Sequence, residues 1–259
     1  MKKNLEYPLN NNPEQELMVR ELCKKLKDLF YLPTHKDVTF IFKNPEKFFS
    51  NEYIRLCDPD KKHPVFEFLN EEFINAFSDY LFQQIKNLDE FKTNKPITIL
   101  EVCAGNGRLT YFLQQKFEKI LSEKVKIIGT DSKQWGLKTF FPVEKLDYKA
   151  AIKKYQPEII ICSWMPPEED FTKDFRSFES VKEYILIGES DNNCCGNRWL
   201  TWGINYDKKD QIIPYVADGF ERIDINEVKK YQICKTDMIG QYNHSNTVSF
   251  RRKNKKIVK

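Results

Sequence analysis

The stretch Ile97–Leu109 places a strand, an acid, a glycine turn and a helix start in direct succession. The apolar run Ile97–Val102 predicts a short buried strand, and Glu101 lies near its carboxyl end. Gly105 and Gly107 then predict a tight turn, because a residue without a Cβ atom bends sharply and lets a ligand approach the backbone closely. The helix that follows would present unpaired N–H groups in its first turn. This layout suits a nucleotide-like ligand.

From residue 96 onward, short isoleucine-rich runs alternate with stretches of helical spacing. The predicted strands after the first are Val125–Thr130, Glu158–Cys162 and Tyr184–Ile187. Such runs are typical of a parallel sheet covered by helices on both faces. Near the end of the chain, Ile212–Phe220 predicts a helix, and two later apolar runs predict an antiparallel pair of strands at one edge of the sheet. The pattern indicates a doubly wound α/β fold.

Residues 1–95 lack this alternation and predict a helical N-terminal extension, which divides the chain into 1–95 and 96–259. A first helix carries apolar residues at helical spacing, namely Met18, Leu22, Leu26 and Leu29. Asn70 predicts the N-cap of a second helix with the apolar stripe Phe73, Phe77, Leu81, Ile85 and Leu88. The extension is rich in aromatic residues, including Phe48, Phe49, Tyr53, Phe66 and Phe68. These aromatics either pack against the main domain, line a substrate pocket or bind a protein partner.

Composition narrows the class of protein. Hydrophobic residues make up 41% of the 259 residues and charged residues 31%, which predicts a packed core. No apolar run approaches the ~20 residues that span a bilayer, and the start lacks a signal-peptide pattern, so we expect a cytoplasmic or nuclear protein without membrane contact. Seven scattered cysteines and three separated histidines predict reduced thiols and no metal site. The net charge of +4 demands no nucleic-acid partner, although the basic tail Arg251–Lys256 is compatible with one.

The glycine-turn segment resembles the first motif of the class I S-adenosylmethionine-dependent methyltransferases, an acidic residue followed by x-Gly-x-Gly-x-Gly. Glu101, Gly105 and Gly107 match this motif, whereas Cys103 stands where the family most often has glycine. The resemblance covers about residues 96–252 and implies a seven-stranded, mostly parallel sheet whose last strand is antiparallel. An ordinary strand–turn–helix with two glycines is the alternative interpretation of this stretch taken alone.

The resemblance implies S-adenosylmethionine as cofactor and assigns its contacts to the carboxyl ends of successive strands. The backbone after Glu101 would hold the methionine part, and Glu101 would favour its cationic side. Asp131 would accept hydrogen bonds from both ribose hydroxyls, and Asp147 would accept one from the adenine amino group; the alternatives are a surface aspartate and a helix cap. The predicted cofactor-binding residues are Glu101, Cys103, Ala104, Gly105, Asn106, Gly107, Asp131, Asp147, Tyr148 and Ser163.

By the same resemblance, the end of the predicted strand Glu158–Cys162 would carry the reacting groups. Ser163 and Trp164 precede Pro166, and this loop resembles the Pro-Pro motif of amino-group methyltransferases, in which a polar side chain and an aromatic ring hold the target amine. The rigid prolines would fix the loop beside the reactive methyl group, or form an ordinary turn. After the next strand, Glu189 or Asp191 would act as general base.

The predicted function is therefore direct methyl transfer from S-adenosylmethionine to an unidentified acceptor, with nitrogen favoured over oxygen. One alternative is a non-catalytic methyltransferase-like subunit that serves as a binding or scaffold module. The other is a different Rossmann-type enzyme that uses a nucleotide, against which position 110 counts, because Thr110 replaces the third glycine of the dinucleotide fingerprint.

Overall fold

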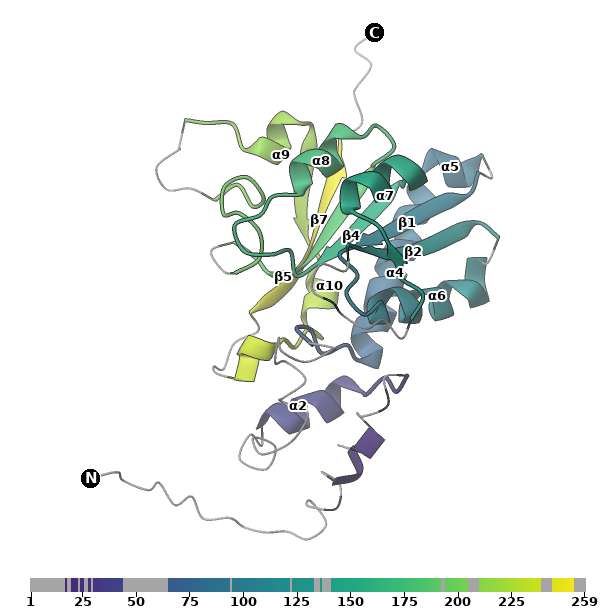
Figure 1. Ribbon diagram of the computed structural model, residues 1–259, viewed down its shortest axis with the longest axis vertical. Coiled ribbons are helices and arrows are strands. Elements are labelled where there is room, and N and C mark those ends of the chain that lie inside the picture. Colours follow the sequence, from purple (N-terminus) through teal and green to yellow (C-terminus); the bar gives the residue numbers. More distant parts are fainter. Residues whose placement is uncertain are drawn as a thin grey trace, which may run out of the picture.

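The computed structural model describes residues 17, 20–22, 24–25, 28, 30–43, 65–93, 95–121, 123–132, 136, 141–191, 194–204, 210–238 and 244–253. Its strands form one seven-stranded sheet in the order β3-β2-β1-β4-β5-β7-β6 (Figure 1). The strands are β1 Ile97–Val102, β2 Val125–Asp131, β3 Glu144–Lys145, β4 Ile159–Ser163, β5 Glu183–Glu189, β6 Phe220–Asp224 and β7 Ser245–Arg252. The first five pair in parallel, and β7 runs antiparallel to both β5 and β6. The predicted fold class is confirmed.

Helices cover both faces of the sheet (Figure 1). Neighbouring residues of each central strand point to opposite faces and so belong to two different cores. One core packs Ile99 of β1 and Ile161 of β4 against α4, α6 and α10. The other packs Leu100 and Ile160 against α7, α8 and α9. The helices are α2 His35–Lys43, α4 Glu71–Asn87, α5 Asp89–Lys92, α6 Arg108–Leu121, α7 Tyr148–Tyr155, α8 Thr172–Ser177, α9 Pro214–Ala217, α10 Asn226–Lys229 and the 3₁₀ helix η2 Lys235–Met238.

The N-terminal region contributes α4 to the core of the sheet. Its predicted cap is confirmed, because the Asn70 side chain accepts a hydrogen bond from the backbone N–H of Phe73 at 2.9 Å. The predicted stripe from Phe73 to Ile85 is buried against the strands. Of the preceding helix, Leu22 is buried, while Met18, Leu26 and Leu29 lie outside the described residues, as do Phe48, Phe49 and Tyr53.

The C-terminal third departs from the prediction in one place. The stretch Ile212–Phe220 is helical only over Pro214–Ala217, and Phe220 begins β6. Gly219 separates the two elements with a φ of +81°, a left-handed conformation that ends the helix. The late antiparallel pair is confirmed: β6 and β7 are neighbours, and β6 forms the edge.

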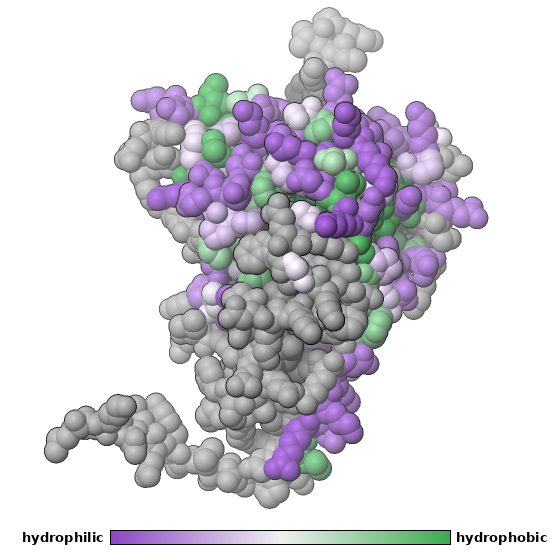
Figure 2. Space-filling view, in the orientation of Figure 1, coloured by the Kyte–Doolittle hydropathy of each residue, from purple (hydrophilic) through white to green (hydrophobic). Residues whose placement is uncertain are grey.

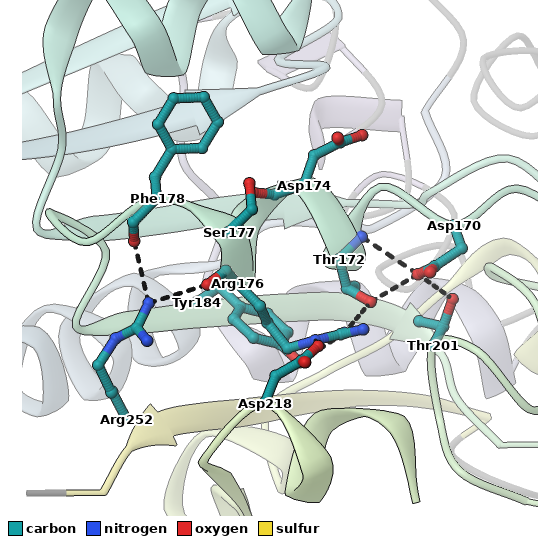
Figure 3. A network of polar contacts seen from close by, with 10 residues as sticks. All are labelled: Asp170, Thr172, Asp174, Arg176, Ser177, Phe178, Tyr184, Thr201, Asp218 and Arg252. Atoms are coloured by element: carbon teal, nitrogen blue, oxygen red, sulfur yellow. Dashed lines mark hydrogen bonds and ion pairs between the residues drawn. The ribbon is translucent and has the colours of Figure 1, made fainter. Parts of the chain in front are cut away.

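A buried arginine joins the loops that follow β4 and β5 (Figure 3). The Arg176 guanidinium donates to Asp218 at 2.7 Å and to the Thr172 hydroxyl at 2.5 Å. Asp170 accepts from the hydroxyls of both Thr172 and Thr201, at 2.5 and 3.1 Å. Because the guanidinium is nearly inaccessible to solvent, its charge needs these partners. The network thus holds α8 against residues 197–203 and joins the loop after β4 to the loop after β5 through Asp170 and Thr201.

The surface over α7, α8 and α9 is mainly hydrophilic, with scattered apolar residues (Figure 2). Ile212 and Val216 are among the exposed large apolar side chains on this side. Among the described residues, none of the helices is long and apolar enough to cross a membrane.

Candidate functional site

The glycine turn between β1 and α6 is built from left-handed backbone conformations. Cys103, Gly105 and Gly107 have φ values of +54°, +56° and +80°. The conformation of Cys103 gives a physical reason why glycine is common at this position in the family that the motif resembles. Asn106 accepts from the backbone N–H of Arg108 at 3.0 Å and so starts α6. The predicted strand–turn–helix is confirmed.

Glu101 lies beneath this turn. Its side chain is 2% exposed, and the Thr110 hydroxyl of α6 donates a hydrogen bond to it. Burial raises the pKa of Glu101 to about 7, and the charge of Asp131 adds to the shift, while the Thr110 bonds oppose it. Gly129 of β2 leaves room for this contact, since a Cβ atom there would lie 2.6 Å from the Thr110 hydroxyl oxygen. Thr110, noted in the sequence only as a missing glycine, therefore holds the buried acid.

Asp131 meets the turn directly. Its carboxylate accepts a hydrogen bond from the backbone N–H of Gly105 at 3.0 Å. The backbone N–H of Ala104 donates to the Thr130 carbonyl at 3.0 Å, so two hydrogen bonds join the turn to the end of β2. The two acids, Glu101 and Asp131, thus gather at one turn, as their positions at neighbouring strand ends predicted.

Gly107 is needed for a reason that the sequence did not reveal. A Cβ atom at this position would lie 2.4 Å from a Val143 methyl carbon and 3.2 Å from the Phe141 Cβ atom. Phe141 also stacks on Tyr111 of α6, with ring centroids 4.6 Å apart. The segment that leads into β3 therefore packs on the turn at Gly107. The contact of Gly107 with a cofactor remains a prediction.

Asp147, predicted to contact the adenine, caps a helix. Asp147 is exposed and accepts from the backbone N–H of Lys149 at 2.9 Å, which makes it the N-cap of α7. Tyr148 donates its hydroxyl to Asp174 at 2.8 Å and stacks on Phe171 at 4.3 Å. The structure thus gives Asp147 the role named as its alternative, and its contact with adenine remains a prediction.

The end of β4 carries the predicted reacting groups. The Ser163 hydroxyl oxygen is buried and has no hydrogen-bond partner among the described residues. Trp164 has a φ of +54°. Its backbone N–H donates to the Ile187 carbonyl at 2.7 Å, and its indole N–H donates to the Glu67 carboxylate at 3.2 Å. The Pro166 carbonyl accepts from Glu169 N–H at 3.3 Å, which closes the predicted turn. Ser163 and Trp164 therefore lie beside β5 at the carboxyl end of the sheet.

The loops after β4 and β5 form one unit. Gly196 N–H donates to the Met165 carbonyl at 3.3 Å, and Glu168 N–H donates to the Gly196 carbonyl at 3.1 Å. Gly188 is required by this packing, since a Cβ atom there would lie 2.7 Å from the Cys195 sulfur. Trp202 of the same loop is buried and packs in the core.

Of the two candidate bases, Glu189 is the one without an arginine partner among the contacts of the described residues. Its buried carboxylate accepts from the Thr236 hydroxyl. Asp191 instead forms an ion pair with Arg222 at 2.6 Å; although burial opposes it, this pair lowers the pKa of Asp191. Asp191 is therefore held in an ion pair, and the role of Glu189 as general base remains a prediction.

The structure also brings Glu67 to this edge, which sequence reasoning missed. Glu67 forms an isolated antiparallel bridge with Cys234, and its buried side chain contacts Trp164. Both partners are far from Glu67 in sequence. A buried position for a charged residue in an irregular segment leaves no periodic signal. Among the described residues, no group of three or more His, Cys, Asp or Glu side chains gathers to hold a metal ion.

Comparisons with known proteins found similar structures but no similar sequences. No protein-family model matches the chain, and no curated protein matches it. The CurJ carbon methyltransferase is 12% identical with a TM-score of 0.43, covering 70% of this chain and 54% of that one. The citrinin polyketide synthase CMeT domain is 15% identical with a TM-score of 0.44, covering 72% and 54%. The magnesium protoporphyrin IX methyltransferase from Synechocystis PCC 6803 with bound SAM is 9% identical with a TM-score of 0.36, covering 83% and 96%. The match thus spans about half the length of the first two proteins.

The strand order decides the fold class. Five parallel strands are followed by β7, which lies antiparallel between β5 and β6. The fold is class I methyltransferase-like. In this methyltransferase-like sheet the strand order reverses between β1 and β4, and ligands of doubly wound sheets bind outside the carboxyl ends at such a point. The glycine turn and Ser163 come from the ends of β1 and β4 at this reversal, and Asp131 comes from the end of the neighbouring β2.

The buried acids predict that stability falls as the pH rises. Burial raises the pKa of Glu101 from its ordinary 4.5 to about 7 and that of Glu67 to about 8. The folded chain therefore binds these protons more tightly than the unfolded chain. The stabilisation is complete below pH 4.5 and is lost as the pH rises, up to about pH 7 for Glu101 and about pH 8 for Glu67. Each group contributes a slope of up to ~1.4 kcal/mol per pH unit.

Urea unfolding between about pH 5 and 8 measures this slope. Glu101→Gln should make the pH dependence of the free energy of unfolding shallower, because the amide cannot titrate. A free energy of unfolding that stays constant or rises over this range would contradict the assignment of buried, neutral carboxyls.

Proposed function

We propose that this protein is an S-adenosylmethionine-dependent methyltransferase that transfers a methyl group directly to an acceptor still to be identified, with a nitrogen nucleophile favoured. The observation that carries the proposal is the contact between the Asp131 carboxylate and the Gly105 N–H at the reversal point of the sheet, beside the Ser163–Trp164 loop. It gathers the predicted ribose acceptor and the predicted methionine-binding turn at one place.

The residues present fit such a cofactor. Asp131 offers a carboxylate for the two ribose hydroxyls, which are good donors to a charged acceptor. The turn at Cys103–Gly107 offers backbone groups for the methionine part. The buried Ser163 hydroxyl, which lacks a partner among the described residues, is a polar group that a bound molecule would satisfy. The cofactor, when bound, supplies a methyl group on a sulfonium, already activated for transfer.

The protein's task is then to position the acceptor. Orientation of two reactants contributes ~7–11 kcal/mol to lowering a barrier of this kind. Ser163 and the loop carbonyls would accept hydrogen bonds from the acceptor's N–H groups, and the Trp164 ring would pack on it. A nitrogen that arrives protonated must first lose a proton, and Glu189, at the end of β5, would receive it.

The proposal is tested with labelled S-adenosylmethionine and separate protein, RNA, DNA and small-molecule extracts. We expect label to enter one class of extract and to depend on the full chain. A chain that binds the cofactor but labels none of these extracts would support the non-catalytic subunit instead.

Trp164→Ala should slow this transfer about 100-fold while cofactor affinity stays close to that of the wild type, because the ring is assigned to the acceptor. Calorimetry with the demethylated cofactor provides the affinity, and initial rates of labelling provide the rate. Full labelling activity in Trp164→Ala would show that the loop after β4 is not where the acceptor binds.

A further inference from the structure

Glu67 is a buried acid that the proposed reaction has not used. It belongs to the short segment before α4, where the Phe68 N–H donates to the Ile233 carbonyl at 2.8 Å and the Lys235 N–H donates to the Phe66 carbonyl at 3.0 Å. These bonds join residues 66–68 to residues 233–235 and lay both segments beside the amino end of β7. That end lies next to the carboxyl end of β5, because Ser245 pairs with Glu189.

Three donors converge on the Glu67 carboxylate. Ser245 donates its hydroxyl to one oxygen at 3.0 Å, and Gln232 donates its amide to the same oxygen at 3.3 Å. Trp164 donates its indole N–H to the other oxygen at 3.2 Å. An ionised carboxylate can accept all three bonds, whereas a carboxamide would turn its NH₂ group toward at least one donor.

The bond to Trp164 sets the orientation of the indole. The ring also packs on Phe66, with centroids 5.4 Å apart, and its backbone is held by the Ile187 carbonyl. A bond to the indole N–H is directional, so it selects one orientation of the ring among those that packing alone allows. Phe66 and Glu67 both come from the segment that precedes the parallel sheet.

We propose that Glu67 is a positioning residue of the methyl-acceptor site, which holds the Trp164 indole in the orientation that receives the acceptor. This inference rests on the proposed function, since it is that proposal which places the acceptor at Trp164. The segment before α4 would then complete the site, although it lies about 100 residues before the reacting loop in the chain.

The charge state of Glu67 gives the proposal a distinctive signature. Burial raises its pKa to about 8, against the effect of its three donors, and the charge of Asp237 adds to the rise. The titratable neighbours are Cys234, whose pKa burial raises to about 11, and Asp237, which contacts His244 at 3.5 Å. Lys235 lies over the Phe66 ring at 5.0 Å. The indole should therefore sense a titration near pH 8 that originates in Glu67.

The test is ¹⁹F NMR of the full chain labelled with 5-fluorotryptophan, with the Trp164 resonance assigned from Trp164→Phe. We expect this resonance to move with a midpoint near pH 8 in the wild type and to lose that titration in Glu67→Gln. The matched control is Glu183→Gln, which alters another buried acid, at the amino end of β5, that accepts from Ser249 and Tyr80 instead. The control should keep the Trp164 titration.

The same proteins are then compared with S-adenosylhomocysteine and with labelled methyl transfer to extract. Above about pH 8, where Glu67 is ionised, we expect Glu67→Gln to retain affinity within about threefold and to lose about tenfold in transfer. A Trp164 resonance that titrates equally in Glu67→Gln, or transfer that is unchanged, would overturn the inference. A wild type that binds no S-adenosylhomocysteine would instead overturn the proposed function, and a Glu67→Gln protein that only melts earlier, with the Trp164 titration intact, would reduce Glu67 to a structural role.

Discussion

Asp131→Ala is expected to weaken binding of S-adenosylhomocysteine by about 2–3 kcal/mol, or roughly 30- to 160-fold in Kd. The substitution removes a charged acceptor for two ribose hydroxyls. It also removes the acceptor of the Gly105 N–H, which leaves the bond from the Ala104 N–H to the Thr130 carbonyl to hold the turn to β2. Calorimetric titration of the wild type and the variant measures the difference.

A matched control separates the site from general loss of charge. Asp89 on α5 is a highly exposed acid that pairs with Lys92, and Asp89→Ala should leave the affinity unchanged. Thermal unfolding of both variants shows whether Asp131→Ala is still folded at the temperature of the titration. Equal affinity of Asp131→Ala and the wild type would remove Asp131 from the cofactor site.

Gly107→Ala is expected to destabilise the protein by about 2–5 kcal/mol through two separate effects. The left-handed φ of +80° strains any residue with a Cβ atom, at a cost of ~1–2 kcal/mol. The added methyl group would also lie 2.4 Å from a Val143 methyl carbon, and such overpacking costs ~1–3 kcal/mol. Urea unfolding provides the free energies.

Gly219→Ala isolates the first effect, the backbone strain. Gly219 has a φ of +81°, almost the same as that of Gly107, but a Cβ atom there would meet nothing within 4 Å. We therefore expect Gly219→Ala to show the strain alone, and Gly107→Ala to be the more destabilised of the two. Equal destabilisation would mean that the segment ending at Val143 does not pack on the turn.

The strands of the central sheet could be predicted from the sequence because a strand buried on both faces leaves a continuous apolar run. Ile97–Val102 and Ile159–Ser163 differ from their predicted bounds by at most one residue at either end. The glycine turn was predictable for a similar reason, since Gly105 and Gly107 mark it locally. The helix expected over Ile212–Phe220 was mostly wrong, because its apolar residues serve a short helix, a glycine turn and an edge strand in succession.

The contacts that shape the site could not be predicted in this way. Glu67 and Trp164 are 97 residues apart in sequence, and Glu189 and Thr236 are 47 apart. The role of Thr110 depends on a glycine in another strand. None of these partners is marked by periodicity or spacing, because the fold alone brings them together.

The N-terminal region shows the same limit. The division of the chain at residue 95 remains a prediction, as do a protein partner for the extension and a cytoplasmic or nuclear location. Yet α4 shares a core with β1 and β4, and Arg108 at the start of α6 donates to the Tyr31 carbonyl at 2.6 Å. These contacts lead us to expect that removal of residues 1–90 would expose apolar residues of the sheet as well as alter the site.

Calorimetric titration of the intact chain with S-adenosylhomocysteine, alongside NAD, shows whether the glycine turn and Asp131 bind this cofactor. We expect saturable binding of one S-adenosylhomocysteine per chain and no binding of NAD, because the dinucleotide fingerprint ends in Thr110 rather than glycine. Binding of NAD, or no heat from S-adenosylhomocysteine with a folded protein, would contradict it.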